Sequence, residues 1–217
     1  MIKDTALKYL GYDKKQILSE EMEQLIDSCI QEVKETAQPG IFCRLFTLGQ
    51  NPLRIEETGD EIPGEQMKEL LENCDQCLLI GCTLGISIER KIKYYAKIDM
   101  TKAAIMDAVS SAYLEDVCDE YEEKLGYVNR TYRACPGYGD FPLKFNRRIA
   151  QLLDIHKNLA VTITPDNLLI PQKSMLGLIG IGNKNRKKKC GTCIMREDCC
   201  FRKRGQRCYE SGSEKIC

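Results

Sequence analysis

The chain has 217 residues, of which 43% are hydrophobic and 29% are charged, as is typical of a globular protein with a sizeable buried core. Its 32 basic and 32 acidic side chains give a formal net charge of zero, so no overall field draws it towards nucleic acid or an anionic membrane. The first residues are a mixed polar segment, and the longest nearly apolar stretch, residues 175–182, is far too short to span a bilayer. We therefore expect a cytoplasmic protein with no nucleic-acid or membrane partner.

Hydrophobic patterning predicts alternating groups of helices and strands. Residues 19–33 repeat apolar side chains every three or four positions, which indicates one face of a helix. Residues 77–81 are an uninterrupted apolar run, which indicates a strand buried on both faces. Asp99 is the expected N-cap of the longest helix, and Gly126 should end it. The remaining predicted elements are strands at 41–48, 53–56, 160–164, 168–170 and 175–181 and helices at 64–73, 86–97, 100–124 and 143–153.

The order of these elements clusters the helices and places hairpin-like strands between them, without a regular βαβ repeat. It predicts an α+β fold in which an antiparallel or mixed twisted sheet has flanking helices. A change of composition near residue 183 predicts two parts. These are a main domain over residues 1–182 and a small, basic, cysteine-rich C-terminal appendage over residues 183–217.

One segment, RACPGYGDFP at residues 133–142, combines residue types that suit ligand binding. Arg133 offers a planar fork of donors that can hold a carboxylate by two parallel bonds. Gly137 lets the backbone bend or approach a ligand closely, and Tyr138 adds a ring face and a hydroxyl. Such a loop suits a zwitterionic or nucleoside ligand, and a purely structural turn is the alternative.

Together with KYLGYD and CLLIGCTLG before it and LAVTITPDNLLIPQKSMLGLIGIG after it, this segment resembles the activation (reactivation) domain of cobalamin-dependent methionine synthase, in its stand-alone bacterial form. The resemblance covers roughly residues 5–182 and is most specific at 133–142 and 171–174. The chain departs from the long multidomain enzymes in having Gly139 where they have proline. It also has Leu178 and Ile179 where they carry aromatic residues.

The resemblance implies an accessory subunit that binds S-adenosylmethionine and serves a partner methyltransferase whose cobalamin has become oxidised. One electron and the methyl group of S-adenosylmethionine then restore methylcobalamin. By the same resemblance, Arg133 holds the ligand carboxylate and Ala134 meets the adenosyl part through its backbone. Gly137 and Tyr138 line the pocket, and Glu115 faces the ligand ammonium. The chain would supply no catalytic side chain and would act as one component of a methyltransferase system.

Cysteine is the most unusual feature of the composition, because six of the 13 cysteines lie in the last 28 residues. A C-x-x-C turn, Cys190 to Cys193, can place two thiolates on one metal ion. Cys199, or Cys200 in its place, and Cys208 are the expected remaining ligands. Four thiolates suit either a [4Fe–4S] cluster or zinc, and the electron that reactivation needs favours the iron–sulfur cluster. Disulfide pairing is a further alternative.

Several other residues are expected to be structural. His156, the only histidine, is expected to be a polar surface residue. Cys74 and Cys77 form a second C-x-x-C, but Cys77 enters a predicted buried strand. Gly177 and Gly180 lie in the last predicted strand, where they would allow close packing.

A second functional hypothesis is a metal-stabilised module that binds or regulates a corrinoid protein without S-adenosylmethionine chemistry. The missing aromatic residues at Leu178 and Ile179 favour it. Under both hypotheses the main partner is a cobalamin-binding methyltransferase protein, and an electron-transfer protein is a candidate second partner. The basic run at residues 185–189 is interpreted as a solvated linker or a docking face for an acidic partner.

Overall fold

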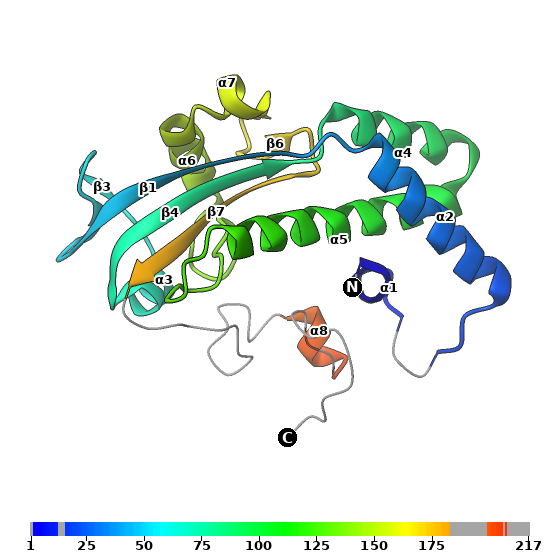
Figure 1. Cartoon of the computed structure of the whole chain (residues 1–217), viewed down its shortest axis with the longest axis horizontal. Helices are drawn as coiled ribbons and strands as arrows, with labels where there is room; N and C mark the ends of the chain where they lie inside the picture. Colours follow the sequence, from blue (N-terminus) through cyan, green and yellow to red (C-terminus); the bar gives the residue numbers. More distant parts are fainter. Residues whose placement is uncertain (1, 13–15, 183–198, 206, 208–217) are drawn as a thin grey trace.

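A computed structural model of the chain describes residues 2–12, 16–182, 199–205 and 207 (Figure 1). The helices are α1 (Ile2–Tyr9), α2 (Glu20–Thr36), α3 (Glu65–Leu71), α4 (Ile86–Ile98), α5 (Met100–Lys124), the 3₁₀ turn η1 (Leu143–Phe145), α6 (Asn146–Leu153), α7 (Ile155–Leu159) and α8 (Cys200–Lys203). The strands are β1 (Gly40–Gln50), β2 (Leu53–Ile55), β3 (Asp60–Glu61), β4 (Cys74–Thr83), β5 (Thr162–Ile163), β6 (Leu169–Ile170) and β7 (Ser174–Gly182).

The main sheet has five strands in the order β3-β2-β1-β4-β7, and every pairing in it is antiparallel. β4 is an interior strand: it pairs with β1 from Gly40↔Thr83 onwards and with β7 along nearly its whole length. Because both of its edges and both of its faces are covered, β4 can be a continuous apolar run, as the sequence predicted. β5 and β6 form a separate two-stranded hairpin.

Helices cover both faces of the sheet (Figure 1). α6 and α7 lie above it, and α5 runs lengthwise below it. The upper core joins the sheet to α3, α6 and α7 through side chains such as Leu79, Ile149 and Leu176. Below the sheet, a small cluster of Leu78, Ile80 and Ile179 packs against residues at the C-terminal end of α5.

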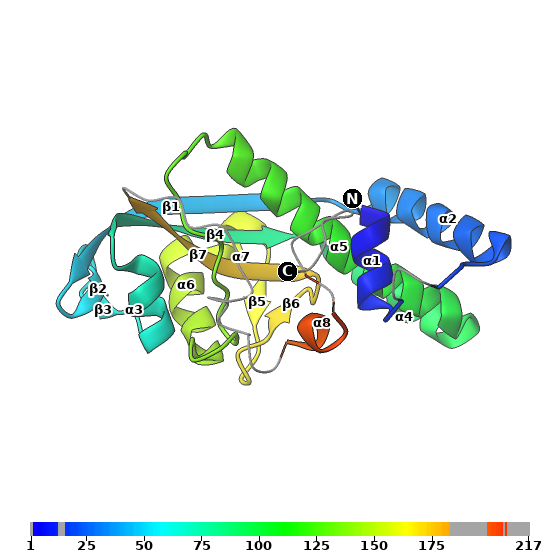
Figure 2. The same ribbon diagram turned by 90° about the horizontal axis from the view of Figure 1, so that it is seen from below.

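α5 joins two parts of the molecule. Its N-terminal half lies in a second core with α1, α2 and α4, beyond the end of the sheet (Figures 1 and 2). Its C-terminal half continues beneath the strands. The side chain of Asp99 caps its first turn by accepting a bond from the Lys102 amide at 2.9 Å, as predicted. Gly126, two residues after its end, has a φ of 71°, which favours glycine.

The predicted fold class is confirmed, and most predicted elements are present with shifted ends. The predicted helix at 143–153 divides into η1 and α6, and the predicted strand at 160–164 shrinks to β5. α7 was missed because its two ends are set by left-handed backbone conformations at Asp154 and Ala160. Such conformations are usually predicted from a glycine, and neither position has one. His156 lies in α7 and is exposed, as expected of a polar surface residue. The predicted boundary at residue 183 stays a prediction.

A polar network around Glu32 of α2 links three of the helices beyond the end of the sheet, α2, α4 and α5. Its carboxylate accepts bonds from Lys91 of α4 at 2.8 Å, Lys102 of α5 at 2.9 Å and the Tyr95 hydroxyl at 2.7 Å. Burial acts to raise the pKa of Glu32, but the bonds from Lys91, Lys102 and Tyr95 outweigh it and lower the pKa to about 2. The carboxylate is therefore more stable as an anion in the folded chain than in the unfolded one.

We expect Glu32→Gln to lower the free energy of unfolding by about 1–2 kcal/mol at neutral pH, because a charged acceptor shared by three donors is lost. A depressed folded-state pKa stabilises the fold above the unfolded value, ~4.3, and this contribution disappears as the pH falls towards the folded value. The difference in the free energy of unfolding between wild type and variant should therefore disappear as the pH falls from ~4 to ~2. Urea denaturation at several pH values measures it, with Glu35→Gln on the exposed face of α2 as the control. Equal effects of the two substitutions would contradict the prediction.

Candidate functional site

The segment before the glycine–tyrosine turn adds a further edge to the main sheet. Thr131 donates its amide hydrogen to the Gly180 carbonyl at 2.9 Å. Ala134 and Leu178 exchange two backbone bonds, of 2.9 and 2.8 Å. Residues 129–134 therefore run antiparallel to β7. In Figure 2 the chain can be followed from the C-terminal end of α5 back towards this strand. The pairing fixes the position of Arg133.

Gly177 lets the Arg133 side chain pass beneath β7. A Cβ atom added at Gly177 would lie 2.6 Å from Cγ and 2.9 Å from Cδ of Arg133, closer than real Cβ contacts allow. The stem of the arginine thus occupies the space that a side chain would fill at this position. Gly180 shows the same crowding against Cys74 and Leu71, so the prediction that these strand glycines permit close packing is confirmed.

The Arg133 guanidinium ends among three carboxylates of α5. Its Nη2 atom donates to Glu115 at 2.6 Å and to Asp119 at 3.2 Å, and its Nη1 atom donates to Glu122. Glu122 also pairs with Arg130 at 3.4 Å. We call these five side chains the Arg133 cluster.

Burial divides the Arg133 cluster into an inner and an outer part. Only 4% of the Arg133 side chain and 8% of Glu122 are exposed, whereas 39% of Glu115 and 56% of Asp119 are exposed. Burial opposes the charged form of Arg133, but the nearby acidic groups, Glu115 foremost, outweigh it and hold the pKa of the guanidinium above its usual range. Arg133 is thus a permanent cation whose outer partners face solvent.

The glycine–tyrosine turn follows directly. Gly137 has a φ of 97°, and its amide donates to the Phe141 carbonyl at 2.7 Å. Tyr138 is half-exposed, and its amide bonds the Cys135 carbonyl at 3.3 Å. A tight turn therefore places the tyrosine ring at the surface, as glycine in the left-handed region allows.

The structure brings two of the predicted site residues, Arg133 and Glu115, into direct contact. Ala134 is buried and its backbone is paired with β7. Sequence reasoning missed Asp119 and Glu122. Their spacing could have found them, because positions 115, 119 and 122 fall on one face of a helix.

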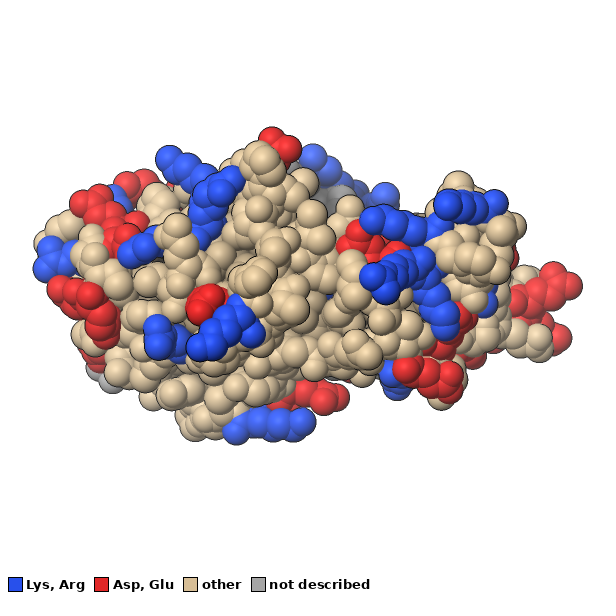
Figure 3. All heavy atoms as spheres, turned by 90° about the horizontal axis from the view of Figure 1, so that it is seen from above, with Lys and Arg blue, Asp and Glu red and all other residues tan. Residues whose placement is uncertain are grey.

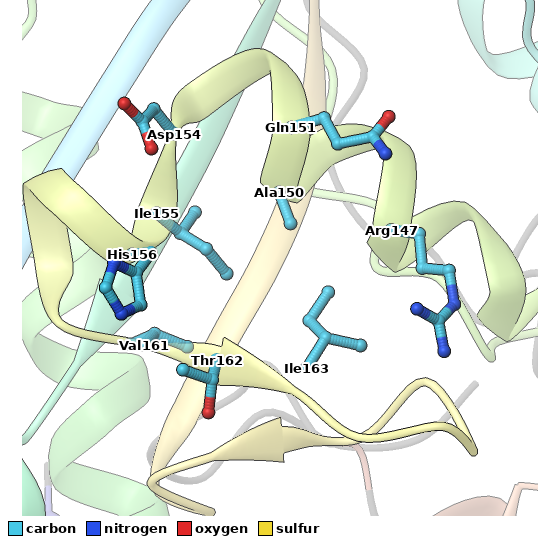
Figure 4. A pocket seen from close by; sticks show the side chains of 9 residues that line it. All are labelled: Arg147, Ala150, Gln151, Asp154, Ile155, His156, Val161, Thr162 and Ile163. Carbon is cyan, nitrogen blue, oxygen red and sulfur yellow. The ribbon is translucent and has the colours of Figure 1, made fainter.

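A hollow lies on the opposite side of the sheet from the Arg133 cluster, between α6, α7 and β5 (Figure 4). It measures about 340 Å³ and is lined by Arg147, Ala150, Gln151, Asp154, Ile155, His156, Val161, Thr162 and Ile163. Arg147 donates to Asn167 and to the carbonyls of Thr164 and Pro165, so its guanidinium holds the loop between β5 and β6. Figure 3 shows this upper face with acidic and basic side chains interspersed and no patch of one sign, which is typical of a solvated surface.

Most cysteines in the main part of the chain are buried. Cys74 and Cys77 are buried, and burial raises the pKa of Cys77 to about 12, so its thiol stays protonated. Within the described part of the chain, no group of three or more His, Cys, Asp or Glu residues could hold a metal ion. Of the four predicted tail ligands, Cys199 is half-buried before α8, and Cys190, Cys193 and Cys208 lie outside the described residues.

The described part of the tail contacts α1. The rings of Tyr9 and Phe201 lie 5.9 Å apart, and Lys8 donates to the Arg207 carbonyl at 3.1 Å. These contacts place α8 on the helical end of the molecule, on the first helix of the chain. None of the described helices is long and apolar enough to cross a membrane.

Comparison with known proteins gives a structural match only. No protein-family model and no curated protein matches the sequence. Among solved structures, the crystal structure of the MetH reactivation domain bound to AdoHcy aligns with a TM-score of 0.66, over 95% of this chain and 83% of that one, at 12% identity. The chain has the fold of that domain. At this identity the match shows the fold, and it confirms the architecture expected from the sequence.

We expect Gly177→Ala to lower the free energy of unfolding by about 1–3 kcal/mol, because the new methyl group collides with a stem whose far end is fixed by carboxylates. Gly40→Ala is the matched control, since its added Cβ would lie 3.4 Å from the nearest atom. In an Arg133→Ala background the colliding Cγ is absent, so Gly177→Ala should lower the free energy of unfolding by less than it does in wild type. Chemical denaturation of the four proteins of this cycle measures the coupling, and an unchanged cost would contradict the prediction.

Proposed function

We propose that the chain binds S-adenosylmethionine beneath β7, beside Arg133, and acts as an accessory subunit in the reductive reactivation of a cobalamin-dependent methyltransferase. The observation that carries this proposal is the contact between Arg133 and Glu115 at 2.6 Å. These are the residues that the family resemblance assigns to the ligand carboxylate and ammonium. The shared fold with a reactivation domain solved with AdoHcy supports the same function.

The Arg133 cluster complements the amino-acid end of the ligand. A zwitterionic ligand carries a carboxylate and an ammonium a few ångströms apart, and the cluster offers a cation with two exposed anions beside it. The ligand carboxylate would replace Glu115 or Asp119 on the Nη2 atom of Arg133. Glu115 would then accept from the ligand ammonium, the role that the family resemblance assigns to it. Binding would exchange ion pairs without leaving a buried charge unpaired, which keeps its cost low.

The adenosyl end would lie along the segment that follows. The Ala134 carbonyl accepts one bond from Leu178 and has a second lone pair for an adenine amino group. Tyr138 stands half-exposed beyond it, where its ring can cover the ligand. Gly137 sets the turn that positions this ring.

The residues of this chain bind and orient; they do not carry the reaction. S-Adenosylmethionine supplies a methyl group on a positive sulfonium, and the partner's cobalamin receives it together with one electron. The role of Arg133 is to hold the amino-acid end, and the role of the turn is to hold the nucleoside end. The partner would be a cobalamin-binding methyltransferase protein, with an electron-transfer protein as a second candidate.

The second candidate function is a corrinoid-protein-binding or regulatory module without S-adenosylmethionine chemistry. Two observations favour it: the Arg133 guanidinium is already satisfied by three carboxylates, and both backbone groups of Ala134 are paired. Titration of the purified chain with S-adenosylmethionine separates the two functions, because this module would release no binding heat.

We expect Arg133→Ala to weaken S-adenosylmethionine binding by about 1.5–3 kcal/mol, because a charge-assisted pair with the ligand carboxylate is lost. Arg133→Lys keeps the charge without the planar fork and should give an intermediate loss. Isothermal titration calorimetry measures both, and circular dichroism checks that the variants fold. Arg44→Ala, an exposed arginine on β1, is the control and should bind like wild type. Unchanged affinity in folded Arg133→Ala would remove this residue from the site.

For the tail we propose that Cys190, Cys193, Cys199 and Cys208 hold a [4Fe–4S] cluster, with zinc as the alternative metal. Anaerobic purification should then give a brown protein with several irons per chain, and Cys190→Ser should reduce the iron content. Cys43→Ser, in β1, is the control and should leave the iron content unchanged. A colourless protein with one zinc per chain would contradict the iron–sulfur cluster and show a structural zinc site instead.

A further inference from the structure

The Arg133 cluster carries an excess of negative charge. Its two cations, Arg130 and Arg133, face three anions. Glu122 is buried between the two arginines, and these three side chains together carry one positive charge, whereas Glu115 and Asp119 carry two negative charges. The excess therefore lies on the two exposed carboxylates, Glu115 and Asp119, which share one Nη2 atom of Arg133.

Of these two carboxylates, Asp119 is the freer to meet a ligand. It lies 3.2 Å from Nη2 whereas Glu115 lies 2.6 Å from it, and it is the more exposed of the two. Asp116 and Glu120 lie beside it on α5. Burial together with the charges of Glu120 and Asp119 raises the pKa of Asp116, which indicates that these carboxylates repel one another.

This charge distribution distinguishes two closely related ligands. S-Adenosylmethionine carries a carboxylate, an ammonium and a sulfonium, so its amino-acid end is a net cation. Its demethylated product is a thioether with a net charge of zero there. Contacts with the carboxylate and the ammonium are available to both ligands, whereas only the methyl donor offers a third, positive group to a second carboxylate.

We infer that Asp119 is the specificity residue of this site, and that its carboxylate recognises the sulfonium charge of the methyl donor. The inference rests on the proposed function and deepens it. Glu115 is then left for the ammonium and Arg133 for the carboxylate, so each charge of the ligand has one partner. Loss of the methyl group removes the charge that Asp119 attracts, so the spent ligand is released in favour of a fresh donor.

The test compares three probes: S-adenosylmethionine, S-adenosylhomocysteine and sinefungin, in which a protonated amine replaces the sulfonium. In wild type the two cationic probes should bind more tightly than the thioether by about five- to tenfold, and added salt should narrow the gap. Asp119→Asn should remove this preference by weakening only the cationic probes. Asp119→Glu, which restores the charge, should recover it, and Glu120→Gln on the neighbouring position is the control.

The outcomes separate this inference from the function on which it rests. If Asp119→Asn weakens all three probes equally, Asp119 holds a group common to them and the inference fails, while the proposed function stands. If wild type binds the donor and the thioether equally well, the inference fails in the same way. If wild type binds none of the probes, the proposed function fails and the inference fails with it.

Discussion

The ion pairs between Arg133 and α5 hold the proposed site together. The arginine starts on a segment paired with β7, passes beneath Gly177 and ends among carboxylates of α5. An unpaired guanidinium in this buried position would cost several kcal/mol, so the helix, the strand and the segment must keep their relative positions. The same contacts join the sheet edge to the helix below it. Fold stability and the proposed ligand recognition therefore depend on one side chain.

Much of the fold was accessible from the sequence because its strongest signals are local. The apolar run of β4, the periodicity of α2 and the cap at Asp99 each reflect short-range physical chemistry, and each appears in the structure. What escaped prediction depends on tertiary context. α1 is only eight residues long and owes its place to packing against α5, and α7 is enclosed by two left-handed residues.

The candidate site was predictable only as far as the resemblance reached. Arg133 was singled out by its residue type and given its role by the family pattern, Glu115 was named from that pattern alone, and the two meet in the structure. Asp119 and Glu122 were not, because an acidic residue on a long helix is usually solvated, and the partners of these two, Arg133 and Arg130, come from a segment that meets α5 only in the folded chain. The pairing of Ala134 with Leu178 likewise depends on a contact between segments far apart in the chain.

The length of α5 has a mechanical consequence. Several of its side chains from Ile105 to Cys118 lie in the core with α1, α2 and α4, and its C-terminal half carries the carboxylates of the Arg133 cluster. Glu115 lies about 22 Å along the helix from Met100, so a tilt of α5 by about 5° about its first residue would move Glu115 by roughly 2 Å. A hydrogen bond does not survive such a displacement. Because α8 contacts α1, the described part of the tail touches the same helical core that holds α5 in place.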